Sequence, residues 1–112
     1  MKIFLFNAYD IVGQTYLNEK PIMATSEIAC LLAYYNSFVK EKDPLKNPYG
    51  SKTVNLVIFG FLECSIENEP DNFKEDYQEY NAKEVVIRIN QIMAERGVED
   101  YILDETAEEE KK

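Results

Sequence analysis

The apolar segment 53–62 constrains the fold of this chain more than any other part of its sequence. Its β-branched and aromatic side chains, among them Val54, Val57 and Phe59, favour an extended strand. Apolar residues follow one another here without alternating with polar ones, so both faces are expected to be covered, as in the centre of a sheet. The chain is 112 residues long, and we therefore expect a single domain built around this strand.

The sequence also predicts two amphipathic helices. The first begins at Thr25 or Ser26, either of which can cap it, and ends before Pro44 because a residue that precedes proline disfavours the helical conformation. The second begins at Asn81, which forms a capping-box pattern with Glu84. In both segments the apolar residues recur at helical spacing, so each helix has one face suited to packing on a sheet.

Three shorter segments complete the expected sheet. Residues 2–8 and 14–18 are predicted to be two strands that pair with each other, and residues 101–103 a last short strand. The predicted fold class is therefore α+β: a small antiparallel sheet in the order β-β-α-β-α, with the two amphipathic helices packed on one face.

The negative charge of the chain is concentrated in its second half. The net charge is −9, of which residues 1–61 carry +1 and residues 62–112 carry −10. This division predicts one folded domain over residues 1–103, in which residues 63–81 form an acidic connecting segment. Residues 104–112 are expected to be an acidic, disordered tail.

The absence of histidine excludes several kinds of active site. A Ser-His-Asp triad, a Cys-His pair and an imidazole metal site all need that residue. The four glycines form no phosphate-binding loop pattern. We therefore expect a protein that is not an enzyme and has no cofactor, although a magnesium site made of carboxylates stays open.

The two cysteines and the apolar runs bear on where the protein works. Cys30 and Cys64 each lie in an apolar run and are expected to be buried free thiols, which fits a reducing cytoplasm. No apolar run approaches the roughly 18 residues that span a membrane, and the N-terminus lacks the pattern of a signal peptide. The expected location is cytoplasmic, without a membrane partner.

One stretch combines basic and aromatic residues in the manner of a single-stranded DNA interface. Its lysines would neutralise phosphates, and its tyrosines would stack on bases. Phe38 belongs to the same stretch but lies on the apolar face of the predicted helix, and lysines beside a proline-containing loop are also typical of ordinary surface. The candidate nucleic-acid-binding residues are Lys40, Lys42, Lys46, Lys52, Tyr34 and Tyr49.

Motifs in the first 64 residues resemble a known viral family. In order, they are Met1-Lys2-Ile3-Phe4, Tyr9-Asp10, Tyr16 followed by Pro21, a threonine-containing start of the first helix, Pro48-Tyr49, and a strand from Leu56 to Gly60-Phe61. This order is similar to the small nonstructural protein of gokushovirus-type microviruses, tailless phages with a single-stranded DNA genome. Leu62-Glu63 stands where that family carries an acid after the Gly-x-Phe step, and the last 48 residues extend beyond the match.

The resemblance implies a non-catalytic phage nonstructural protein. Proteins of this family are described as binding single-stranded DNA during genome replication or a switch to packaging. The resemblance therefore implies single-stranded DNA as the partner and the cytoplasm of the host cell as the location.

Two other functions are compatible with the residues. An acidic protein that mimics the charge of DNA would inhibit a host nucleic-acid-binding or defence protein by occupying its basic surface. An assembly protein would instead form a homodimer or bind another structural protein through the second helix or an edge strand. The acidic-inhibitor alternative would use a surface whose acidic residues are Glu67, Glu69, Asp71, Glu75, Asp76 and Glu79. Tyr77 and Tyr80 lie among these residues in the sequence.

Overall fold

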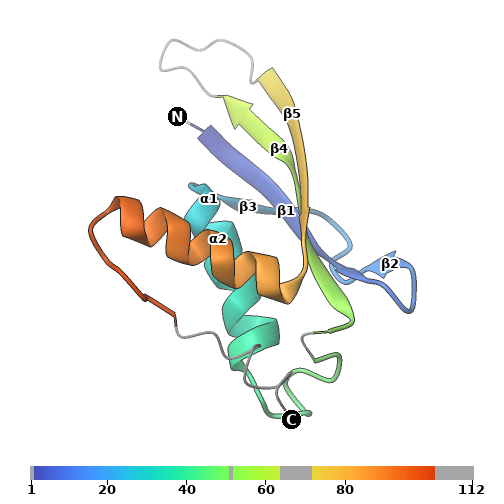
Figure 1. The fold of residues 1–112 in the computed structure, drawn as a ribbon. Coiled ribbons are helices and arrows are strands. Elements are labelled where there is room, and N and C mark those ends of the chain that lie inside the picture. Colours follow the sequence, from blue (N-terminus) through green and yellow to red (C-terminus); the bar gives the residue numbers. More distant parts are fainter. Residues whose placement is uncertain (1, 51, 64–71, 103–112) are drawn as a thin grey trace.

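The fold is an antiparallel sheet with helices on one of its faces (Figure 1). A computed structural model describes residues 2–50, 52–63 and 72–102. Within these residues the chain forms five strands: β1 (Lys2–Asp10), β2 (Thr15–Tyr16), β3 (Ile22–Ala24), β4 (Val54–Glu63) and β5 (Asn72–Tyr80). The helices are α1 (Glu27–Tyr34), its π-helical continuation η1 (Tyr35–Lys40) and α2 (Ala82–Glu95).

The central strands of the sheet are β1 and β4. They pair with each other along their whole length, and β5 pairs with the other side of β4. The outer edge of β1 is shared by β2 and β3, and every pairing is antiparallel. The predicted α+β class with a small antiparallel sheet is therefore confirmed, and the apolar segment 53–62 is a central strand, as expected.

The ends of the helices follow the predicted capping residues. The Ser26 hydroxyl accepts a hydrogen bond from the backbone N–H of Ala29 at the start of α1. Asn81 and Glu84 form the capping box of α2, in which each side chain accepts from the backbone N–H of the other residue. These bonds satisfy donors that a helix N-terminus would otherwise leave unpaired.

The hydrophobic core lies between the helices and one face of the sheet. The buried side chains of Leu31 from α1 and Val85 and Ile89 from α2 join the same cluster as Leu56 and Ile58 of β4. Both helices therefore cover the same face, as predicted, and Figure 1 shows them together on one side of the strands.

An ion pair connects the two helices beside this core. Arg88 of α2 donates two hydrogen bonds to the Glu27 carboxylate of α1, from Nε at 3.1 Å and from Nη2 at 3.0 Å. The two-point geometry orients α2 against the first turn of α1.

Two strands of the sheet were not predicted. β3 follows Pro21 directly, and β5 occupies residues 72–80 of the segment predicted to be an acidic connection. β5 is polar and exposed along nearly its whole length, so it lacks the apolar alternation by which a strand is recognised in sequence. Its pairing with β4 makes it a strand, and the prediction of a connecting segment was wrong for these residues.

The end of the described chain also differs from the prediction. Tyr101 and Ile102 lie in a bend rather than a strand. Ile102 is nevertheless buried, and its backbone N–H and C=O both bond to the side-chain amide of Asn90 in α2. The predicted tail over residues 104–112 lies outside the described residues.

Candidate functional site

The face of the sheet opposite the helices carries a continuous row of four aromatic rings. Tyr9 of β1 contacts Tyr16 of β2, with ring centroids 5.2 Å apart. Tyr16 contacts Phe59 of β4 at 5.5 Å, and Phe59 contacts Tyr77 of β5 at 6.4 Å. The row, which we call the aromatic row, crosses the sheet from one edge to the other and was not predicted from the sequence.

A bulge in β4 helps to aim Phe59 at this row. Residues 58 and 60 of β4 pair with the consecutive residues Phe6 and Leu5 of β1, so Phe59 is an extra residue in the strand. The bulge depends on Gly60, whose φ of +151° lies in a region that other residues rarely adopt. A Cβ at this position would overlap the carbonyl oxygen of Lys74 in β5.

Apolar side chains extend the same face beyond the aromatic row, toward the end of β4 and the start of β5. Ile3 pairs with Leu62, and Leu62 pairs with Phe73, so strand alternation puts all three side chains on the same face. Phe73 is exposed on this surface. Val57, in the middle of the face, is only 1% exposed, so neighbouring side chains rather than a second layer of helices cover it.

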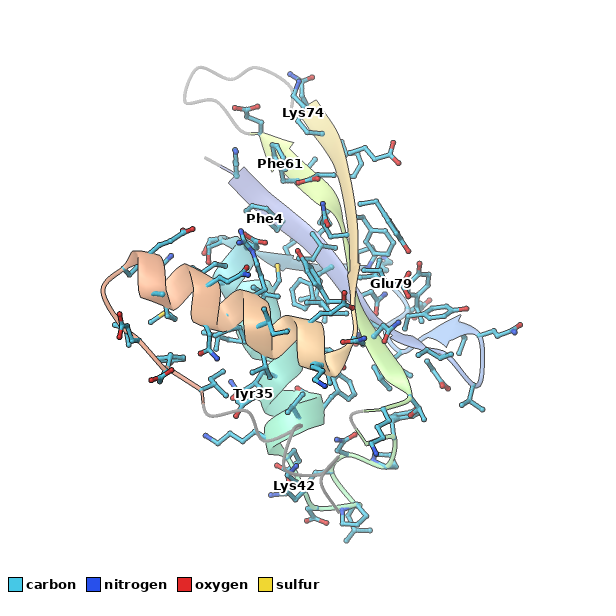
Figure 2. All side chains as sticks on the ribbon, in the orientation of Figure 1. Phe4, Tyr35, Lys42, Phe61, Lys74 and Glu79 are labelled. Carbon is cyan, nitrogen blue, oxygen red and sulfur yellow. The ribbon has the colours of Figure 1, made fainter. Side chains whose placement is uncertain are left out.

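Carboxylates border the aromatic row on β5. Side chains alternate between the two faces along a strand, so Glu75, Tyr77 and Glu79 lie on the same face. Figure 2 shows Glu79 on the side of β5 away from the helices. The Tyr77 hydroxyl donates to one Glu79 oxygen at 3.0 Å, and Asn55 Nδ2 donates to the other at 2.8 Å. We call the aromatic row with Glu75 and Glu79 the open face.

The Glu79 carboxylate places a negative charge next to Tyr77 on the open face. Partial burial, the hydrogen bond to Glu79 and its charge, and the nearby Tyr16 and Tyr9 hydroxyls together raise the pKa of Tyr77. Among these causes, only the Glu79 carboxylate is a charge that would attract a cation while the tyrosines are protonated. Ring faces also attract ammonium and guanidinium groups, whereas carboxylates repel phosphates.

The predicted basic and aromatic residues are only partly brought together. Lys42, Lys52 and Tyr49 line one hollow of about 400 Å³ beyond the end of η1, which Glu41 also lines. Lys40 and Lys46 are exposed but do not line it. In Figure 2, Lys42 lies at the opposite end of the molecule from Lys74 of the hairpin. We call this hollow the lysine hollow.

The loop that forms the lysine hollow is organised by a buried asparagine. Asn47 Nδ2 donates to the carbonyl oxygens of Phe38 and Glu41, and its Oδ1 accepts from the backbone N–H of Gly50. These three bonds join the end of η1 to the start of the segment that leads into β4.

Tyr34 is buried, and its assignment as a stacking residue is corrected. The side chain is 2% exposed, and its hydroxyl donates a hydrogen bond to the backbone carbonyl of Val54. Position 34 falls on the same side of α1 as Leu31, so it faces the sheet. Its hydroxyl finds a partner there, which makes burial of the tyrosine favourable.

The predicted acidic surface is divided by the sheet. Glu75 and Glu79 lie on the open face, whereas Asp76 lines a hollow of about 310 Å³ on the helix side, together with Tyr80 and Arg88. Glu67, Glu69 and Asp71 lie outside the described residues.

Cys30 is a buried free thiol, as predicted, and burial raises its pKa to about 12. Cys64 lies outside the described residues. Among the described side chains, no group of three or more acids and cysteines could hold a metal ion. None of the helices in the described part of the chain is long and apolar enough to cross a membrane.

No protein-family model matches this chain, and neither does a curated protein or a solved structure. The similarity to the gokushovirus-type protein therefore stays a prediction, and the function is argued from the surfaces described above.

Proposed function

We infer that this protein acts by binding, and that its open face docks a cationic segment of another protein. The observation that carries this inference is the aromatic row bordered by Glu75 and Glu79, on the sheet face that none of the described helices covers. Aromatic side chains commonly supply most of the energy of a protein interface, and bordering charges select the partner.

The charges favour a basic protein over DNA at this face. A nucleic acid carries a phosphate at every nucleotide, and Glu75 and Glu79 would repel it where its bases would need to stack. Lysine and arginine side chains would instead lie over the exposed rings and pair with the carboxylates. A host nucleic-acid-binding protein has a basic surface of this kind, as the acidic-inhibitor alternative requires.

A peptide with alternating lysine and tryptophan residues tests the proposal directly. The protein has no tryptophan, so the emission of the peptide reports binding without interference from the protein. We expect affinity that falls as salt is added, and no affinity for a peptide with glutamate in place of lysine.

Two charge-matched variants show where the peptide binds. The double variant Glu75→Lys, Glu79→Lys reverses the charge of the open face, and Glu95→Lys, Glu99→Lys makes the same change in net charge elsewhere on the exposed surface. The first should weaken binding by about tenfold or more, and the second should change it little. Equal losses would mean that the peptide responds only to overall charge, and the proposal would then be abandoned.

The lysine hollow supports single-stranded DNA binding as a second candidate function. Lys42, Lys52 and the exposed Tyr49 share one hollow, which combines cations with a ring able to stack on a base. This is also the function that the resemblance to the gokushovirus-type protein implies.

Fluorescence anisotropy with a labelled single-stranded oligonucleotide tests this second candidate. The variant Lys42→Glu, Lys52→Glu should abolish binding, whereas Lys40→Glu, Lys46→Glu changes the charge equally outside the lining of the hollow. If both variants bind like the unchanged protein, the lysine hollow is not a DNA site. If both variants lose binding equally, the DNA responds to the overall charge of the protein and not to the lysine hollow.

A further inference from the structure

β5 forms a long, continuous edge of the sheet. It has nine residues, the first eight of which are exposed, and β4 is its only partner among the described strands. The opposite edge is divided between β2, with two residues, and β3, with three. An unpaired strand edge offers backbone N–H and C=O groups to an incoming chain, so β5 is the better template of the two edges.

The side chains of β5 alternate in a way that specifies the charge of a neighbouring strand. Phe73, Glu75, Tyr77 and Glu79 lie on the open face, where acidic and aromatic residues alternate. Residues directly opposite each other on paired strands interact, and opposite charges stabilise the pair. A neighbour of β5 would therefore carry basic residues beside Glu75 and Glu79, and a basic residue beside Tyr77 would lie over its ring.

We propose that the cationic partner segment binds as an added antiparallel or parallel strand along β5, with lysine or arginine at every second position facing Glu75 and Glu79. This mode rests on the proposed function, because it assigns a conformation and a residue pattern to the same partner. Backbone hydrogen bonds would supply affinity, and the alternating side chains would supply specificity.

The same charges argue against a second copy of this chain at the edge. An antiparallel pair of β5 strands centred on Tyr77 puts Glu75 of one copy opposite Glu79 of the other. A pair centred on Asp76 puts this residue opposite its own copy. Like charges directly opposite each other are destabilising, so β5 discriminates against itself and in favour of a basic strand.

Backbone N-methylation of the partner peptide separates strand addition from docking by side chains alone. The alternating lysine–tryptophan peptide is compared with the same sequence N-methylated at its central residues, which removes N–H donors but keeps every side chain and charge. We expect the methylated peptide to bind the full-length protein about tenfold or more weakly, because several hydrogen bonds are lost together.

Amide hydrogen exchange of the complex identifies the edge that is used. Bound peptide should slow exchange of amides in β5 that point away from β4, and leave the β2 and β3 edge unchanged. Equal affinity of the two peptides, or protection confined to the β2 and β3 edge, would overturn strand addition while the docking function stands. Failure of both peptides to bind would overturn the docking function as well.

Discussion

The hydroxyl of Tyr77 donates a 3.0 Å hydrogen bond to the carboxylate of Glu79, two residues along the same exposed edge strand. Asn55 of β4 holds the second carboxylate oxygen at 2.8 Å. The negative charge is thus fixed at the end of the aromatic row, next to Tyr77, which is 52% exposed. A cation that stacks on Tyr77 would meet an already oriented carboxylate, which reduces the entropy lost on binding.

Substitution of Tyr77 should separate the contribution of the ring from that of its hydroxyl. Tyr77→Phe keeps the ring and the Asn55 bond to Glu79 but loses the hydroxyl bond to Glu79, so we expect a small loss of affinity for the cationic peptide. Tyr77→Ala removes the ring and should weaken binding by about 2 kcal/mol, or about 30-fold. Titration of peptide fluorescence measures both effects. Unfolding by urea serves as the control, because the exposed side chain contributes little to stability. Full affinity in the alanine variant would remove Tyr77 from the interface.

Substitution of Gly60 should destabilise the bulge between β4 and β5. Gly60→Ala puts a Cβ against the Lys74 carbonyl and forces an unfavourable φ, so we expect a loss of about 2 kcal/mol or more in the free energy of unfolding. Gly50→Ala is the matched control, because Gly50 also has a positive φ but nothing within 4 Å of a Cβ. Similar losses in the two variants, measured by urea unfolding, would contradict the role of the close approach.

Asn7 of β1 should contribute to stability through its hydrogen bonds to Asn18. Its Oδ1 accepts from the Asn18 backbone and side chain at 3.2 and 3.1 Å, and its Nδ2 donates to the Asn18 carbonyl at 2.9 Å. Asn7→Ala should lower the free energy of unfolding by about 2 kcal/mol, because it leaves Asn18 groups without their partner. The exposed Asn36→Ala should change stability by less than about 0.5 kcal/mol. If Asn7→Ala loses as little stability as Asn36→Ala, water replaces the hydrogen bonds between Asn7 and Asn18.

Stability should fall at alkaline pH, in part because of Cys30. Burial raises the pKa of this thiol from 9.0 to about 12. Its contribution is therefore complete below pH 9 and decreases as pH rises from about 9 toward 12, where only the unfolded state loses the proton. The decrease is about 1.4 kcal/mol per pH unit for one thiol.

Urea unfolding at about pH 7 and about pH 10 measures this effect. Cys30→Ala should lose less stability than the unchanged protein between the two pH values, whatever the cavity costs at neutral pH. Tyr34 is common to both proteins, and burial raises its pKa too, so it adds the same decrease to each. Identical pH dependence in the two proteins would exclude a contribution from Cys30.

Features encoded by neighbouring residues were predictable from the sequence. The caps at Ser26 and Asn81, the central strand beginning near Thr53, and the burial of Cys30 all depend on local residue type or on a short periodic pattern. The packing of both helices on one face of the sheet was also predictable from the sequence, because each helix has a single apolar stripe. The position of Tyr34 could have been predicted from the same stripe, since it lies three residues after Leu31.

The aromatic row could not be predicted, because its members are far apart in the sequence. Tyr9, Tyr16, Phe59 and Tyr77 meet only when β1, β2, β4 and β5 pair in register. A one-residue change of register would turn each strand over and disperse the rings. The bulge at Phe59 adds a local exception to the alternation from which a face is assigned.

By itself, the sequence determined the α+β class, the central strand and the two capped helices, because these depend on contacts and capping bonds within a few residues. Only the tertiary structure decided that the acidic segment 72–80 is an edge strand, and that its Glu75 and Glu79 border a row of aromatic rings. The physical reason is that β5 has almost no apolar signal of its own. Hydrogen bonds to β4 hold it in the sheet, and such long-range pairing is set by the whole fold rather than by the segment.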